Sequence, residues 1–184
     1  MKPGFNQLYP TTVYLGRLKD SAIVADTCDA ILAKPDLAAL ANSNGAYDPL
    51  DEPEFQDFRD QIVVPAFDSY LAGIGVEGDY RVKSWITGYS AYYDIAVHNH
   101  SGSHYTSIFY LYCSDVDRGG ELIMLDPRTN ANRGYLTKQA QFKPTAYQPQ
   151  TGEYIMFPSY MYHYTTTFTG SLRLALVVDL FFKE

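Results

Sequence analysis

The chain has 184 residues, of which 46% are hydrophobic and 19% are charged, as in a folded domain with one core. Its net charge of −7 argues against a basic groove for nucleic acid, which binds mainly through Lys and Arg. There is no apolar run of signal-peptide length at the N-terminus, and no stretch reaches the roughly 18 apolar residues of a membrane span. We therefore expect a cytoplasmic protein without nucleic-acid or membrane partners.

The first part of the chain predicts an opening strand and a helix. Residues 8–15 are expected to form a strand, and Pro10 keeps it at a sheet edge because proline cannot donate a ladder hydrogen bond. Asp20 or Ser21 can cap a helix that runs to about residue 32, where apolar residues recur at helical spacing. Residues 40–51 carry the turn residues of a surface loop.

A second, longer helix is predicted over residues 52–71, which place apolar side chains on one stripe. Pro65 lies inside this run and lacks a backbone N–H. We therefore expect a kink or a break near Val64.

From Tyr80 onward the sequence alternates and becomes rich in β-branched and aromatic residues. Seven short strands are predicted, at residues 80–88, 91–100, 105–113, 120–126, 153–157, 160–168 and 172–182. This pattern predicts an α+β, mainly β fold: an antiparallel barrel or jelly roll with N-terminal helices packed on it.

The domain organisation follows from this change of character. We expect one domain over residues 1–184, with the first strand and supporting helices in 1–78 and the β core in 79–184. The long polar stretch 127–151 interrupts that core, and a connection of this length is usually functional, so it is expected to act as a lid.

Three of the four histidines fall within seven residues: His98, His100 and His104, with His163 far away in the sequence. On an extended strand, side chains at i and i+2 point to the same face, so His98 and His100 should project together. Two histidines on one strand and a third on another can hold a non-haem iron. The same pattern also fits ordinary polar side chains on a solvated strand. His104 either contacts substrate or is a solvated loop residue.

Arg173 follows His163 by ten residues, with Thr169, Gly170 and Ser171 as a turn between two expected strands. A hairpin at this turn would return Arg173 to the side of His163. A guanidinium in a β core needs a carboxylate partner, which it can bind in a planar, bidentate manner. The arginine therefore suggests an acidic co-substrate.

Several motifs in this order resemble those of the small bacterial and phage members of the 2-oxoglutarate and Fe(II)-dependent oxygenase family. The resemblance extends over nearly the whole chain. The matching segments are His98-Asn-His100 with residues 106–111, Gly119-Gly-Glu-Leu with Leu125-Asp-Pro-Arg128, residues 152–159, and finally His163 and Arg173.

The resemblance implies a double-stranded β-helix, which is a cupin-like jelly roll, and assigns roles to individual residues. It implies that His98 and His163 are iron ligands and that Arg173 binds the distal carboxylate of 2-oxoglutarate. Tyr110 would add a hydroxyl to that carboxylate, although packing of this aromatic ring in the core explains it equally well.

His100 stands where the wider family has a carboxylate. We favour His100 as the third ligand of a three-histidine site, so that His98, His100, His163 and Arg173 form the catalytic set. Two alternatives remain open: a carboxylate such as Asp94 or Asp126 reaches the iron, or water fills the position.

The resemblance implies an enzyme that uses Fe(II), 2-oxoglutarate and O2 to hydroxylate a small molecule or a protein side chain. A homodimer is left open, and the location would be the host cytoplasm if the chain is phage-encoded. One alternative is a cupin-type enzyme with three histidines that does not use 2-oxoglutarate. Another is a non-enzymatic phage or surface-binding β-domain that uses its 17 tyrosines as contacts.

Overall fold

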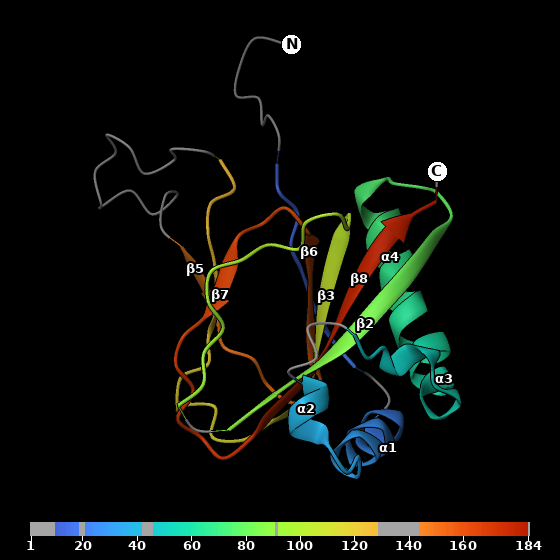
Figure 1. Cartoon of the computed structure of the whole chain (residues 1–184). Helices are drawn as coiled ribbons and strands as arrows, with labels where there is room; N and C mark the ends of the chain where they lie inside the picture. Colours follow the sequence, from blue (N-terminus) through green and yellow to red (C-terminus); the bar gives the residue numbers. More distant parts are fainter. Residues whose placement is uncertain (1–9, 19–20, 42–45, 91, 129–143, 184) are drawn as a thin grey trace, which may run out of the picture.

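The computed structural model describes residues 10–18, 21–41, 46–90, 92–128 and 144–183. Its helices all precede the second strand (Figure 1). They are α1 (Ser21–Leu32), α2 (Leu37–Ala41), η1 (Pro49–Asp51), η2 (Pro53–Phe55), α3 (Gln56–Phe58), η3 (Arg59–Val63) and α4 (Val64–Ile74). Among the described residues, no helix has the length and hydropathy of a transmembrane span.

The strands form two antiparallel sheets that face each other (Figure 1). They are β1 (Tyr14–Arg17), β2 (Tyr80–Tyr89), β3 (Tyr105–Cys113), β4 (Leu122–Met124), β5 (Thr145–Tyr147), β6 (Glu153–Pro158), β7 (His163–Thr165) and β8 (Arg173–Phe182). The larger sheet has the order β1-β6-β3-β8-β2, and the smaller has the order β5-β4-β7. This is the jelly-roll arrangement of a double-stranded β-helix, as predicted.

Strand β8 shows how the sequence positions the two layers. Its even-numbered residues, such as Leu176 and Val178, pack in the core between the large sheet and the helices, which also contains Phe58 and Phe67. Ala175 and Val177 alternate with them and face the smaller sheet. Because both faces are covered, the strand is a nearly continuous apolar run. Ala175 and Val177, on the face toward the smaller sheet, also line a cavity between the two sheets.

The long helix predicted over residues 52–71 is broken into short pieces. One-turn segments lead into the π-helical turn η3, and the regular helix α4 begins only at Val64. Pro65 cannot donate to the carbonyl four residues earlier, and the wider π turn accommodates its ring. The break expected near Val64 is confirmed, whereas the single helix before it was wrong.

Of the predicted strand 91–100, the described residues 92–100 form no ladder, and Tyr92 lies in a turn with a φ of +66°. These residues join β7 and the following segment through two isolated bridges, Tyr93 with Phe168 and His98 with His163. The opening strand is later than predicted, at Tyr14–Arg17. The stretch 127–151 contains a strand, β5, and residues 129–143 of this expected lid lie outside the described residues.

Candidate active site

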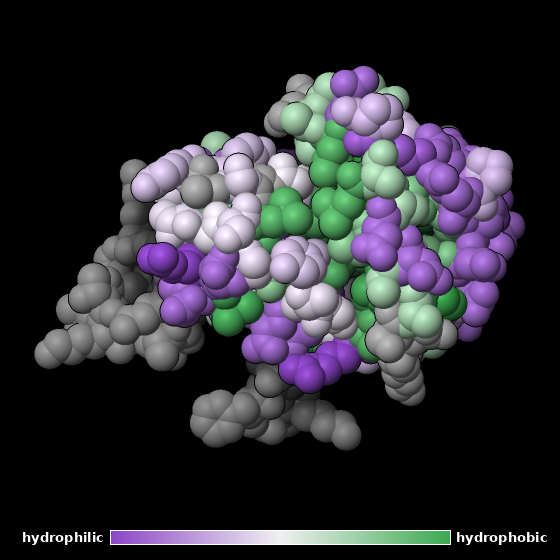
Figure 2. Space-filling model, turned by 90° about the horizontal axis from the view of Figure 1, so that it is seen from below, coloured by the Kyte–Doolittle hydropathy of each residue, from purple (hydrophilic) through white to green (hydrophobic). Residues whose placement is uncertain are grey.

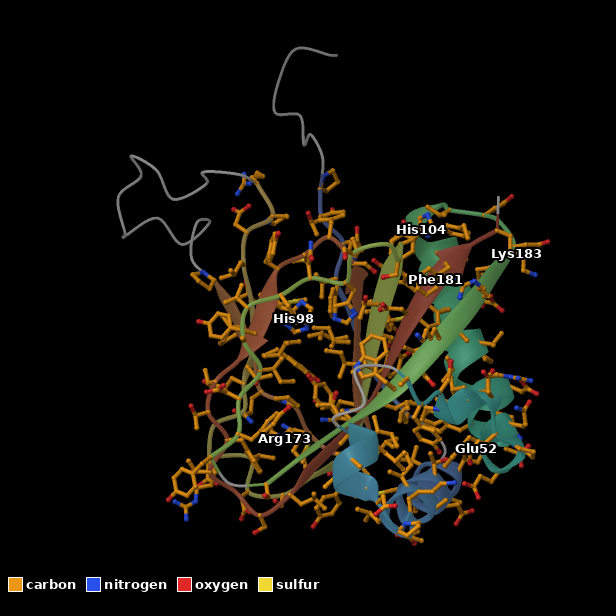
Figure 3. The ribbon with its side chains drawn as sticks, in the orientation of Figure 1. Glu52, His98, His104, Arg173, Phe181 and Lys183 are labelled. Carbon is orange, nitrogen blue, oxygen red and sulfur yellow. The ribbon has the colours of Figure 1, made fainter. Side chains whose placement is uncertain are left out.

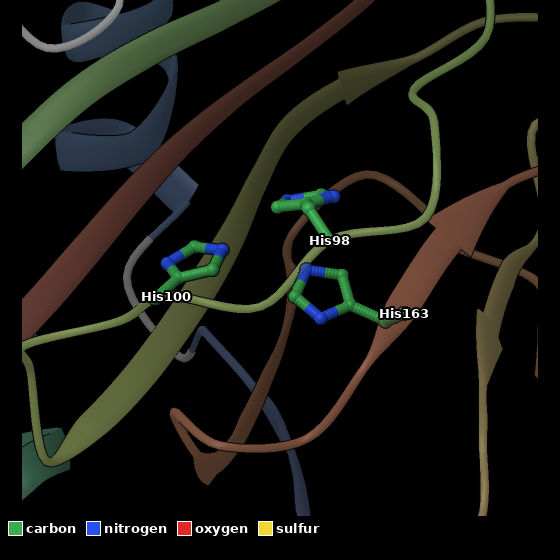
Figure 4. Close-up of side chains that lie close together, drawn as sticks. All are labelled: His98, His100 and His163. Carbon is green, nitrogen blue, oxygen red and sulfur yellow. The ribbon is translucent and has the colours of Figure 1, made fainter.

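His98, His100 and His163 form a compact cluster between the two sheets (Figure 4). One nitrogen from each ring lies within 4.8 Å of the others. The ring centroids are 4.3 Å apart for His98 and His163, 5.2 Å for His98 and His100, and 5.1 Å for His100 and His163. The cluster that the sequence predicted is therefore formed.

Backbone pairing holds the cluster together. The N–H of His98 donates to the carbonyl of His163, and the N–H of His163 donates back, both at 2.9 Å. Two residues on, the N–H of His100 donates to the carbonyl of Ser159 at 3.0 Å. The extended backbone places His98 and His100 on one face, and the reciprocal pair brings His163 beside them.

Each imidazole has an oxygen at its Nδ1 atom. Nδ1 of His98 lies 2.8 Å from the carbonyl oxygen of Ala96, and Nδ1 of His163 lies 3.0 Å from that of Met161. Nδ1 of His100 lies 2.8 Å from the Oδ1 atom of Asp179. Carbonyl and carboxylate oxygens only accept, so Nδ1 carries the proton and Nε2 offers its lone pair in every ring.

Burial favours the neutral form of His163 and of His98. It lowers the pKa of His163 to about 3, and it also lowers the pKa of His98. Neutral imidazole is the form that binds a transition metal, and nitrogen donors suit iron. The donor set therefore fits a mononuclear iron.

The two acidic residues considered as alternative ligands are engaged elsewhere. Asp94 accepts a hydrogen bond from Thr167 at 3.2 Å, and Asp126 pairs with Arg128. Among the described residues, the group of side chains that could hold a metal ion with these histidines contains no carboxylate and no thiol. The described structure thus favours His100 over either carboxylate.

His104 lies apart from the cluster. Its Nδ1 accepts from the N–H of Phe182 at 3.2 Å, and its ring packs against that phenyl group. Figure 3 shows it beside Phe181 and Lys183 near the end of β8, away from His98. This residue stabilises the end of a strand.

A cavity of about 170 Å³ adjoins the histidines. Seen from the end of the molecule where α2 lies, apolar surface gathers in the middle of the face (Figure 2). The described residues that line the cavity, besides the three histidines, are Ala41, Trp85, Thr87, Tyr93, Ile95, Ile108, Tyr110, Leu122, Thr165, Ala175 and Val177. Apart from the imidazoles, none of these side chains is basic or acidic.

Arg173 begins β8 and is fully buried. It precedes Ala175 and Val177 on the same face of the strand, and it lies at a different height from His98 between the sheets (Figure 3). Its Nη1 donates to the carbonyl of Gly120, and the guanidinium lies 4.6 Å from the centre of the Phe168 ring.

The guanidinium is incompletely satisfied. Within the described part of the chain, Nε and Nη2 of Arg173 have no hydrogen-bond partner and no carboxylate forms an ion pair with it. The nearby thiol of Cys113 does not neutralise it, because burial raises the pKa of that thiol to about 11. A buried cation of this kind calls for an acidic ligand.

The hairpin predicted between His163 and Arg173 was wrong. β7 belongs to the smaller sheet and pairs with β4, whereas β8 belongs to the larger sheet and pairs with β2 and β3. The chain crosses from one sheet to the other between them. His163 therefore lines the cavity from the smaller sheet, whereas Arg173 lies on the larger sheet, two residues before the cavity-lining Ala175.

Tyr110 lies on the inner face of β3, opposite Ala175 in the neighbouring strand. It is buried, belongs to the inner core and also lines the cavity. Both interpretations of this tyrosine therefore fit its position.

Asp179 and Thr106 were not identified from the sequence. Asp179 is the one acidic residue in β8, and this carboxylate in an apolar strand is a signal that could have identified it. Thr106 donates to the same oxygen atom of Asp179, at 2.6 Å.

Solved structures confirm the fold. A prolyl-4-hydroxylase from Pseudomonas putida matches with a TM-score of 0.66 and 13% identity over 94% of this chain and 88% of that one. A prolyl hydroxylase from Trichoplax adhaerens, in complex with a hypoxia inducible factor peptide fragment, gives 0.62 and 15% over 92% and 83%. The epimerase SnoN, in complex with Fe3+, alpha ketoglutarate and nogalamycin RO, gives 0.62 and 16% over 92% and 78%. At these identities, the likeness is one of fold.

Comparison with curated proteins finds no match. A family model described as "Putative 2OG-Fe(II) oxygenase" matches residues 83–179, which are 97 of the 184 residues. The matched range contains the histidine cluster and Arg173. Since this model covers more than half of a chain with the corresponding fold, the protein belongs to the family of 2-oxoglutarate and Fe(II)-dependent oxygenases.

Proposed function

We propose that this oxygenase is a hydroxylase in which His98, His100 and His163 hold Fe(II). Arg173, assisted by Tyr110, binds the distal carboxylate of 2-oxoglutarate. The family match favours this function over a cupin-type enzyme without 2-oxoglutarate and over a non-enzymatic β-domain.

The unsatisfied guanidinium of Arg173 carries the proposal. It is fully buried, and two of its nitrogens have no partner among the described residues. Such a group is costly unless a ligand completes it, and a carboxylate accepts two parallel hydrogen bonds from a guanidinium. On the inner face of β8, Arg173 is followed by Ala175 and Val177, which line the cavity beside the histidines. A dicarboxylate can therefore be held at one end while its other end meets the metal.

The chain's own residues fix the ligand and exclude water. The three Nδ1 hydrogen bonds orient the imidazoles, so that their Nε2 atoms converge before any metal binds. Ile108, Leu122 and Val177 supply apolar walls that limit access of water. When bound, Fe(II) and 2-oxoglutarate reduce O2 and insert one oxygen atom into a substrate C–H bond, with release of succinate and carbon dioxide.

The side chains that line the cavity indicate which kind of substrate group can enter it. The lining side chains near its apolar walls include Trp85, Thr87, Tyr93 and Ile95, which are uncharged. Burying an unpaired charge among them would be unfavourable. We therefore propose that the substrate inserts an uncharged group, either from a small molecule or from a peptide side chain.

Anaerobic titration with Fe(II) and 2-oxoglutarate tests the proposal. The complete chelate should produce a weak visible charge-transfer band that neither component gives alone. An Arg173→Met variant should still bind Fe(II) but should require much more 2-oxoglutarate to develop the band. A flat spectrum from the wild-type protein would contradict the proposed function.

A second measurement addresses the substrate. In air, release of succinate from 2-oxoglutarate should be stimulated by peptides that present proline or aliphatic side chains more than by matched peptides with lysine or aspartate. Equal stimulation by the charged peptides would refute the inference about the group that enters the cavity.

A further inference from the structure

Asp179 is a buried carboxylate in an otherwise apolar strand. It lies in β8, where Leu174, Leu176 and Val178 are fully covered, and its own exposed fraction is only 7%. A carboxylate in such surroundings is strongly unfavourable unless hydrogen-bond donors satisfy it. Asp179 therefore requires neighbouring side chains that donate hydrogen bonds to its carboxylate.

The donors come from two elements that are distant in sequence. His100 donates from Nδ1 to Oδ1 of Asp179 at 2.8 Å, and Thr106 donates from its hydroxyl to the same oxygen at 2.6 Å. The Thr106 hydroxyl also lies 2.9 Å from that of Ser159, which in turn accepts from Ser103 at 2.8 Å. A connected polar network therefore stands behind one of the three histidines.

The other two histidines have no comparable support. His98 and His163 donate from Nδ1 to backbone carbonyl oxygens, whereas the partner of His100 is ionisable. The ring of His100 also packs against Trp85, with 5.3 Å between ring centroids. His100 is thus held by contacts on several sides.

We propose that Asp179 is a positioning residue that enables His100 to act as the third metal ligand. By accepting the Nδ1 proton, Asp179 directs Nε2 of His100 toward the other two imidazoles. Asp179 thus places a carboxylate on the far side of the His100 ring. In the wider family, the resemblance implies a carboxylate at the position of His100 itself. This inference rests on the proposed function, in which the three histidines hold the metal.

Carboxylate–histidine–metal arrangements of this kind fix the tautomer and raise the basicity of the ligand. Loss of such a partner typically lowers metal affinity by about 10–100-fold. An asparagine would keep an oxygen that accepts from Nδ1 but would lose the charge. The two effects can therefore be separated by substitution.

The test is a titration of the full chain with Co(II) alone, followed by its visible absorption. Asp179→Ala should weaken Co(II) binding by about 10–100-fold, and Asp179→Asn should fall between Asp179→Ala and the wild type. In a His100→Ala background, Asp179→Ala should cause no further loss, because its partner is already absent. An affinity unchanged in both Asp179 variants, or an equal loss in the His100→Ala background, would overturn the proposal.

A matched control separates positioning from general stability. Asp48 is another partly buried carboxylate and accepts hydrogen bonds from Ser84, on the helix side of the large sheet. Asp48→Ala should lower the thermal midpoint and leave Co(II) affinity unchanged. If the wild-type protein does not bind Co(II), the proposed function fails. If it does bind and the Asp179 variants bind equally well, only the role of Asp179 fails.

Discussion

Replacement of Arg173 by methionine distinguishes a ligand-binding arginine from a structural one. Methionine retains much of the length of the side chain and removes the charge. If Arg173 is kept for a carboxylate ligand, the ligand-free protein should tolerate the change. If the arginine stabilises the fold, the same change should destabilise it severely.

The magnitude follows from the contacts of the guanidinium. Nε and Nη2 of Arg173 have no partner among the described residues, and each buried unsatisfied donor costs about 1–3 kcal/mol. Removing them offsets the lost hydrogen bond to Gly120, about 1.5–3 kcal/mol. The contact with the Phe168 ring adds about 1 kcal/mol to the loss. The opposing contributions nearly cancel, so we expect a change of at most about 1–2 kcal/mol in the free energy of unfolding.

Urea unfolding of the ligand-free protein measures this change, and thermal unfolding with Mn(II) and 2-oxoglutarate measures binding. For the wild type, 2-oxoglutarate at 100 times its Kd should add about 2.7 kcal/mol. This corresponds to a rise of roughly 5–10 °C in the midpoint for a protein of this size. The Arg173→Met variant should show no rise that depends on 2-oxoglutarate.

Arg81→Met is the matched control, because Arg81 is an exposed arginine that stacks on Phe181 at 4.2 Å. It should retain the full effect of 2-oxoglutarate. A loss of about 3–5 kcal/mol in ligand-free Arg173→Met, the typical cost of breaking a buried ion pair, would refute the reasoning. So would an undiminished effect of 2-oxoglutarate in that variant.

Three further predictions concern single residues. Gly120 has a φ of +71°, and a Cβ atom there would collide with the Arg173 guanidinium, so Gly120→Ala should weaken 2-oxoglutarate binding in the thermal assay. Gly152→Ala is its control, because Gly152 has a φ of +79° but open space around it, and an equal loss of binding there would contradict the argument. Tyr110→Phe should raise the KM for 2-oxoglutarate by about 2–12-fold, the equivalent of one hydrogen bond of about 0.5–1.5 kcal/mol, with little change in kcat; an unchanged KM would indicate that the ring only packs. Burial lowers the pKa of His163 to about 3, against about 6.5 in an unfolded chain, so the unfolded state binds more protons below pH 6.5. The free energy of unfolding of the metal-free protein should therefore be highest above about pH 6.5 and should fall as the pH is lowered toward 3. Urea titrations should show a shallower fall for His163→Asn. An equally steep fall in that variant would contradict the assignment of this pH dependence to His163.

The sequence predicted the elements whose signals are local. β3 has the predicted bounds, and its residues from Thr106 to Leu111 are all buried between two covered layers. The pairing of His98 with His100 was also predictable, since side chains two residues apart share a face in any extended segment. The spacing of His163 and Arg173 also singled them out, and the resemblance to the family then assigned their roles.

Long-range pairing could not be predicted in the same way. The turn at Gly170 signals a reversal of the chain, but a reversal does not specify which sheet the next strand joins. β8 pairs with β2 and β3, whose partners depend on contacts far apart in sequence. The break before α4 was predictable from Pro65, whereas the series of short turns preceding it was not.

Asp179 shows a further limit. An acidic residue in an apolar strand signals a special environment, yet 79 residues separate it from His100, and only the fold brings the two together. The prediction considered carboxylates near the histidines in sequence, such as Asp94. The structure provides a carboxylate from the opposite sheet instead.

Asp179 also affects the net charge of the proposed site. In the proposed site, where three neutral imidazoles hold a divalent iron, the iron, the Arg173 guanidinium and the Asp179 carboxylate would leave two positive charges between the sheets. The 2-oxoglutarate dianion neutralises them. A carboxylate ligand at residue 100 would give the same balance without Asp179. In the proposed site, the charge of Asp179 would thus reach the metal through the imidazole of His100, whereas an acidic ligand would bind the metal directly.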